Sequence, residues 1–138
     1  DALADALAEE LSDRVLFKNF TRPILVPMPL SRGRLRERGF NQCELLAEKL
    51  VKRLPAITLL PSALQKIKET LPQTKLARRK EREENLVGAF AVKDAEAVQG
   101  RNIILLDDVI TTGSSMKEAR AALLEAGARD VWCVAVAH

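Results

Sequence analysis

The sequence predicts an α/β fold built on a single, Rossmann-like parallel sheet of about five strands with flanking helices. Short apolar segments, typical of buried strands, alternate with longer segments of helical periodicity. This order favours parallel pairing with right-handed crossovers. No internal repeat interrupts it, and 138 residues are enough for one hydrophobic core. We therefore expect a single domain over residues 1–138.

Each element follows from a local pattern. The expected strands are the apolar runs at residues 24–30, 57–60, 88–93, 102–108 and 131–137. The expected helices cover residues 1–16, 42–54 and 116–126, where apolar side chains recur at steps of three and four. Asn41 is suited to cap the second helix, and Gly127 to end the third.

Composition and charge exclude several classes of protein. No apolar run approaches the roughly 18 residues of a membrane span, and there is no signal-peptide pattern. Cys43 and Cys133 stand alone, so we expect buried thiols, no zinc site, and a reducing, cytoplasmic setting without a membrane partner. The net charge of +3 is only mildly basic. The first residue is Asp1 rather than Met, and we expect a fragment of a longer chain.

The stretch NIILLDDVITTGSS, residues 102–115, organises the prediction. An apolar strand leads to two acids, and a cluster of small residues then precedes a helix. In an open parallel sheet, ligands bind outside the carboxyl ends of the strands. Glycine, hydroxyl groups and the free N–H groups of a helix start together suit one phosphate group. The residues of this expected phosphate loop are Thr111, Thr112, Gly113, Ser114 and Ser115.

Asp107 and Asp108 immediately precede that loop. Paired acids beside a phosphate site suit two neighbouring sugar hydroxyls or a hydrated Mg²⁺. A phosphate at one end and a diol at the other describe a ribose 5-phosphate. The alternative is a strand end with two solvated acids and an N-capping turn.

Two basic stretches complete the pattern. Arginines 32, 34, 36 and 38 follow the first strand, where bidentate guanidinium groups suit a pyrophosphate. A solvated basic loop, or one that contacts a nucleic acid backbone, is the alternative. Residues 75–82 are the densest basic stretch of the chain, in a segment with few apolar side chains that is the best candidate for a mobile lid. A solvated helix with i,i+4 charge pairs is the alternative there.

Three segments carry a family resemblance. Residues 102–115 resemble the diphosphoribosyl-binding motif of type I phosphoribosyltransferases. VPMPLSRGRLRERGFNQ, residues 26–42, is similar to the signature of the ComF-like (competence protein F/GntX) family. Residues 70–90 are similar to a third segment of that family. The resemblance implies a type I phosphoribosyltransferase core, and members usually add an N-terminal four-cysteine zinc module that is absent from this sequence.

The resemblance implies a role for each matched residue. Asp107 and Asp108 would be the catalytic acids that hold the ribose hydroxyls, with Mg²⁺ bound by them directly or through water. The 5-phosphate would lie in the loop of residues 111–115, and the pyrophosphate loop would be Leu30, Ser31 and Arg32. A flexible loop would close over the diphosphate with Gln73, Lys75, Arg78 and Arg82. The signature residues Arg38, Gly39, Phe40, Asn41 and Gln42 would complete the site at a helix start.

The implied function is that of a phosphoribosyltransferase, a glycosyltransferase that uses phosphoribosyl diphosphate and Mg²⁺. No clear hood for an acceptor base can be recognised unless residues 1–22 supply it, so that a purine, a pyrimidine and no base at all stay open. The oligomeric state is not predicted. The alternative is a non-enzymatic competence factor that binds single-stranded DNA and uses the fold as a scaffold. Basic segments favour that alternative, while four Phe, one Trp and no Tyr are few stacking platforms. A third option is a module that docks on a partner, with a nonfunctional pocket.

Overall fold

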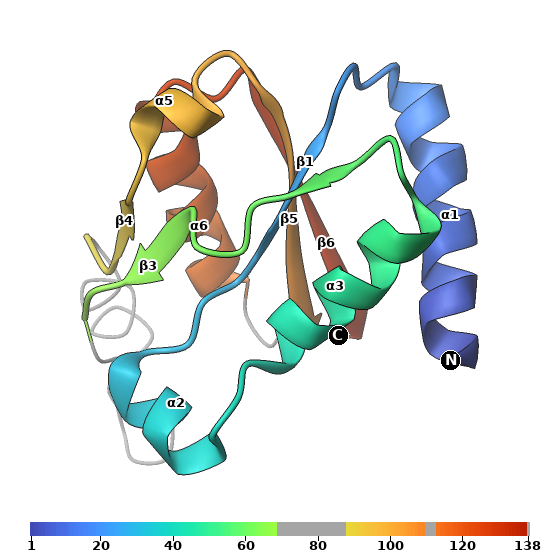
Figure 1. Cartoon of the computed structure of the whole chain (residues 1–138). Helices are drawn as coiled ribbons and strands as arrows, with labels where there is room; N and C mark the ends of the chain where they lie inside the picture. Colours follow the sequence, from blue (N-terminus) through green and yellow to red (C-terminus); the bar gives the residue numbers. More distant parts are fainter. Residues whose placement is uncertain (69–87, 110–112, 138) are drawn as a thin grey trace.

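A computed structural model describes residues 1–68, 88–109 and 113–137 of the chain. Its main sheet has four parallel strands in the order β2-β1-β5-β6 (Figure 1). The strands are β1 (Ile24–Pro27), β2 (Thr58–Leu59), β5 (Asn102–Val109) and β6 (Asp130–Ala137). Their carboxyl ends meet at one edge, because all four run in the same direction. The predicted fold class is confirmed.

Helices cover both faces of this sheet. On one face, α1 (Ala2–Lys18) and α3 (Gln42–Arg53) pack against Ile104 and Leu106 of β5. On the other face, α6 (Ser114–Glu125) packs against Ile103 and Leu105. All four of these β5 side chains are fully buried, which stabilises the fold by about 2 kcal/mol each. The alternation along β5 therefore sets both layers.

Local sequence determines where α6 ends. Gly127 has φ 105°, and its N–H donates to the carbonyl of Leu124 at 3.0 Å. The N–H of Ala128 donates to the carbonyl of Leu123 at 3.1 Å, which completes a Schellman motif. The predicted helix end at Gly127 is confirmed.

The strand expected at residues 88–93 does not join the main sheet. Its core, β4 (Phe90–Val92), pairs antiparallel with β3 (Leu64–Lys66) in a separate two-stranded sheet. The backbone bond from Lys93 to Ala63, at 2.9 Å, extends this ladder. The sequence predicts no strand at β3, since a three-residue strand carries too short a pattern to be recognised. The short helix α5 (Ala95–Val98) then leads back to β5.

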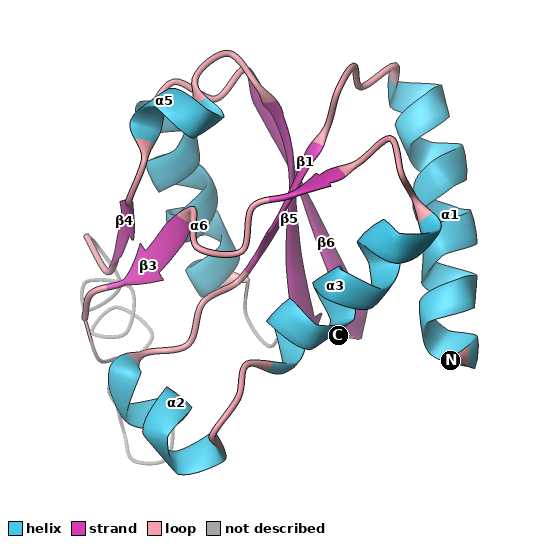
Figure 2. Cartoon of the chain, viewed as in Figure 1, coloured by secondary structure: helices cyan, strands magenta, loops and turns pink. Residues whose placement is uncertain are grey.

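The arginine-rich segment is a helix rather than the expected loop (Figure 2). α2 (Arg32–Arg38) begins where the hydroxyl oxygen of Ser31 accepts a hydrogen bond from the N–H of Arg34 at 3.3 Å. It ends at Gly39, whose φ of 77° is left-handed and whose N–H donates to the carbonyl of Leu35. The helix buries no side chain, so it has no apolar face that a sequence pattern could reveal.

In the part of the chain that the structure describes, no helix combines the length and the apolar character that crossing a bilayer requires.

Candidate functional site

The candidate site lies at the carboxyl ends of β1 and β5. These strands pair side by side, and the N–H of Met28 donates to the carbonyl of Leu106 at 2.8 Å, one residue beyond β1. Asp107 and Asp108 follow directly on β5, and both are half-buried. The segment after β1 leads into α2 and then α3 (Figure 1). Of the sequence-predicted residues, the acid pair and Asn41 of the signature, which donates to the carbonyl of Met28, therefore lie at this edge.

Asp107 is held by two donors. Its Oδ1 accepts the backbone N–H of Asp108 at 2.9 Å and the thiol of Cys43 at 3.6 Å. Burial, followed by the hydrogen bond to the side chain of Asp108, raises the pKa of Asp107 to about 6. The site therefore disfavours uncompensated negative charge, so that a cation or hydroxyl donors placed beside the carboxylates would be bound favourably.

Cys43, in the first turn of α3, is the residue that the sequence analysis missed. Only 5% of its surface is exposed, and burial together with the two nearby acids raises the pKa of its thiol to about 12. It therefore stays protonated and acts as a donor. Its sulfur, one carboxylate oxygen of Asp107 and one of Asp108 lie within 4.8 Å of one another. The sequence signal that could have identified Cys43 is its position two residues after the predicted cap Asn41. This position lies in the first turn of a helix whose start faces the strand ends.

Asn41 connects α3 to the sheet. Its side-chain oxygen accepts the N–H of Cys43 at 3.0 Å, which confirms the predicted cap. Its side-chain nitrogen donates to the carbonyl of Met28, also at 3.0 Å. The neighbouring Phe40 is exposed, with 47% of its surface accessible. Within the signature, Asn41 is thus structural, while Phe40 faces solvent.

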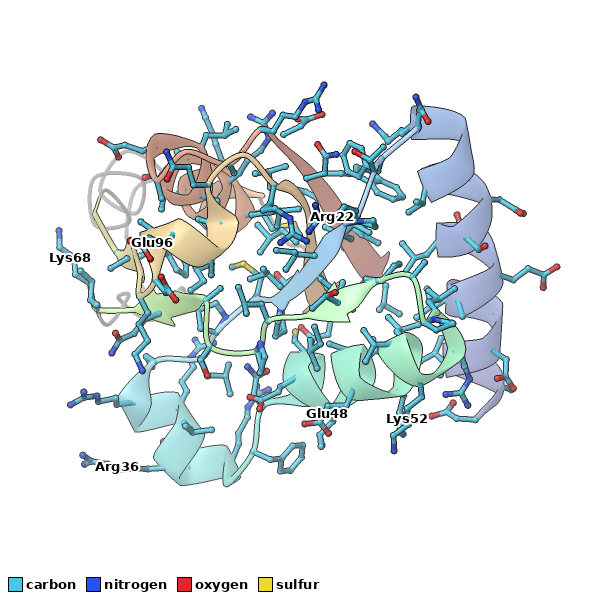
Figure 3. The ribbon with its side chains drawn as sticks, turned by 45° about the horizontal axis from the view of Figure 1, so that its top comes forward. Arg22, Arg36, Glu48, Lys52, Lys68 and Glu96 are labelled. Atoms are coloured by element: carbon cyan, nitrogen blue, oxygen red, sulfur yellow. The ribbon has the colours of Figure 1, made fainter. Side chains whose placement is uncertain are left out.

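The expected pyrophosphate loop leads into α2. Ser31 is buried and caps this helix, while Arg32 is exposed at its first position. Among the described residues, the guanidinium groups of the four α2 arginines have no hydrogen-bond or ion-pair partner. Arg36 projects away from the ribbon on the same side of the molecule as Lys68 (Figure 3). With respect to the described residues, the four arginines are therefore available to an anionic ligand.

The expected phosphate loop is described only in part. Gly113 caps α6 with φ 79°, and Ser114 and Ser115 form the first turn. A glycine cap has no side chain to accept the first N–H groups, so these amides and the helix dipole favour an anion at this end. Thr111 and Thr112 lie outside the described residues. So do the four flexible-loop residues Gln73, Lys75, Arg78 and Arg82.

The acid pair fits a Mg²⁺ ion by the chemistry of its donors. Mg²⁺ prefers oxygen ligands, often one or two carboxylates together with water and substrate phosphates. Asp107 and Asp108 offer such oxygens at the mouth of the site, whereas a protonated Cys43 thiol is no ligand for a hard cation. The carboxylates, rather than the full cluster of three, are the groups that suit the ion.

Comparisons of sequence agree with this arrangement. The family model "Phosphoribosyl transferase domain" matches residues 41–138. Competence protein ComFC of Bacillus subtilis is 39% identical over 104 residues, which cover 75% of this chain and 39% of that protein. DNA utilization protein YhgH of Escherichia coli is 35% identical over 139 aligned residues, covering 96% of this chain and 60% of that protein. The chain thus spans between 39% and 60% of the length of these curated relatives.

Comparisons of structure support the fold. Phosphoribosylpyrophosphate synthetase from Mycobacterium smegmatis superposes with a TM-score of 0.57 at 22% identity, over 97% of this chain and 32% of that one. A hypoxanthine phosphoribosyltransferase from Staphylococcus aureus superposes with a TM-score of 0.56 at 10% identity, over 97% and 62% of the two chains. The chain therefore belongs to the phosphoribosyl transferase domain family, with competence proteins of the ComF type among its relatives.

Proposed function

We propose that this domain binds phosphoribosyl diphosphate with Mg²⁺ and transfers its phosphoribosyl group to a nitrogen nucleophile. The observation that carries the proposal is the pair of half-buried acids at the end of β5, just before the glycine-capped start of α6. The carboxylates can accept hydrogen bonds from sugar hydroxyls, and a phosphate site follows them along the chain. Together they match the two ends of a ribose 5-phosphate. A cytoplasmic setting is part of the proposal.

Each group has a role in the proposed reaction. The carboxylates of Asp107 and Asp108 accept hydrogen bonds from the ribose hydroxyls, and the first-turn amides of α6 bind the 5-phosphate. Ser31 and Arg32, at the start of α2, face the pyrophosphate. When bound through the acid pair, Mg²⁺ supplies positive charge that stabilises the leaving pyrophosphate.

The reaction requires the protein to position the substrates and to stabilise developing charge. It requires no nucleophile from the protein. The bond from C1 of the ribose to the pyrophosphate oxygen breaks, the bond from C1 to the acceptor nitrogen forms, and that nitrogen loses a proton. Positive charge develops on the ribose, beside the two acids, while the arginines meet the departing negative charge. No Ser–His or Cys–His pair is therefore required.

The acid pair provides the test. We expect Asp107→Asn combined with Asp108→Asn to lower the affinity for phosphoribosyl diphosphate at least about a hundredfold, because two charge-assisted contacts are lost. Asp130→Asn is the matched control, since Asp130 is a half-exposed acid at the opposite end of a strand. Unchanged affinity in the double variant would contradict the proposal.

Binding of single-stranded DNA is the second candidate function, and one observation favours it. The guanidinium groups of the α2 arginines have no partner among the described residues, and Leu35 and Phe40 beside them are 43% and 47% exposed. Cations next to an exposed ring suit a phosphate backbone and a stacked base. In this case Arg34→Ala with Arg36→Ala should weaken DNA binding and flatten its dependence on salt. An unchanged salt dependence would count against DNA binding on α2.

A further inference from the structure

Cys43 contacts the acid pair although the family resemblance gives it no role. Its sulfur lies 3.6 Å from Oδ1 of Asp107, and 64 positions separate the two residues in the sequence. We propose that Cys43 is a positioning residue, whose thiol holds Oδ1 of Asp107 so that the other oxygen, Oδ2, is presented to the ligand. The identity of that ligand rests on the proposed function.

The geometry explains why a second donor matters. The terminal torsion of an aspartate side chain is broad and roughly two-fold, so a carboxylate can rotate and exchange its two oxygens. The backbone N–H of Asp108 anchors Oδ1 from within β5 at 2.9 Å. The thiol of Cys43 anchors the same oxygen from α3, a different element of the fold. Two donors from separate elements restrict the rotation and define an inward and an outward oxygen.

The thiol is a suitable donor because it brings no charge. Cys43 is buried, and its neutral S–H group lies against the carboxylate of Asp107 at 3.6 Å. Its place is fixed in turn by Asn41, which binds both the N–H of Cys43 and the carbonyl of Met28 at 3.0 Å. A lysine or arginine here would neutralise the acid pair and oppose a cation. A thiol orients Asp107 and leaves its charge for the ligand.

A matched pair of substitutions separates positioning from packing. Cys43→Ala and Cys43→Ser differ by one hydroxyl group, which can donate where the thiol did. We expect Cys43→Ala to weaken magnesium-dependent binding of phosphoribosyl diphosphate about tenfold, and Cys43→Ser to stay within about threefold of the original chain. The controls are Cys133→Ala and Cys133→Ser at the other cysteine, on β6, which should not change the affinity.

A spectroscopic measurement tests the contact without any ligand. The S–H stretching band of Cys43, assigned by its loss in Cys43→Ser, should move to higher frequency in Asp107→Asn, because an amide oxygen is a weaker acceptor than a carboxylate. The band of Cys133 should not move.

Each outcome decides one question. If the original chain binds and Cys43→Ala binds equally well, the positioning role is overturned while the proposed function stands. Equal losses in Cys43→Ala and Cys43→Ser would overturn it as well, since packing alone would account for them. If the original chain does not bind phosphoribosyl diphosphate, the proposed function fails. The S–H band then tests the contact between Cys43 and Asp107 without a ligand. A Cys43 band that does not shift in Asp107→Asn would overturn the positioning role.

Discussion

The side-chain nitrogen of Asn41 lies 3.0 Å from the carbonyl oxygen of Met28, while the side-chain oxygen accepts the N–H of Cys43 at the same distance. One amide thus joins the end of β1 to the start of α3. Through Cys43, the same helix start reaches Asp107 on β5. The geometry of the acid pair therefore depends on a residue that does not touch it.

Asn41 should stabilise the fold through both of its contacts. Asn41→Ala removes the helix cap and the donor to Met28, which we expect to cost about 2 kcal/mol of unfolding free energy. Asn41→Ser keeps a capping oxygen and loses only the donor, for about 1 kcal/mol. Urea denaturation measures both values. Equal stability of the two variants would show that the cap contributes nothing here.

Asp107→Asn should make the protein more stable at neutral pH. The pKa of Asp107 is raised from 3.8 to about 6 in the folded state, so its ionised form opposes folding. This unfavourable contribution is absent below pH 3.8, grows as the pH rises towards 6 and is complete above that value. Asparagine keeps an oxygen for both donors and carries no charge.

We expect the Asp107→Asn variant to gain about 1–2 kcal/mol above pH 6, after allowance for solvent screening, and to match the original chain near pH 4. Urea denaturation across this pH range, without ligand, provides the measurement. A stability difference that did not vary with pH would mean that the charge of Asp107 is not its cause.

Ser115→Asp should separate helix stability from ligand binding. An acid in the first turn of α6 interacts favourably with the helix dipole, by about 0.5 kcal/mol. The same charge would repel a 5-phosphate bound at this helix start. We therefore expect the affinity of the Ser115→Asp variant for phosphoribosyl diphosphate to fall at least about tenfold. Ser115→Asn is the uncharged control. Undiminished binding by the aspartate variant would mean that the phosphate lies elsewhere.

Gly39→Ala should destabilise the end of α2 through the backbone alone. Gly39 has φ 77°, and an added Cβ would meet nothing within 4 Å. The cost is therefore conformational, and we expect about 1 kcal/mol. Asn tolerates left-handed backbone better, so Gly39→Asn should cost less. Thermal unfolding compares the three proteins, and equal losses for alanine and asparagine would argue against a conformational origin.

Sequence patterns were sufficient wherever an element has a long apolar repeat or a defined cap. Sequence patterns predict the strand that carries Asp107, the cap at Asn41 and the end of α6 at Gly127, and the structure confirms all three. Apolar periodicity and side-chain hydrogen bonding act locally in these places, and therefore leave a local signal.

The remaining features depend on contacts between distant segments. α2 buries no side chain and so has no apolar period, while β3 is three residues long and is defined by its partner β4. In the sequence, Cys43 is an isolated small apolar residue. It contacts Asp107 only because α3 packs across the end of β5. The contact between its thiol and Asp107 arises from tertiary packing, which no local pattern encodes.

The measurement that tests the central claim most directly is a calorimetric titration of phosphoribosyl diphosphate into the purified chain, with and without Mg²⁺. The account predicts binding in the micromolar range, about −8 kcal/mol, that is lost when Mg²⁺ is removed. A folded sample that gives no heat with Mg²⁺ present would contradict it. Single-stranded DNA binding on α2 would then be the leading function.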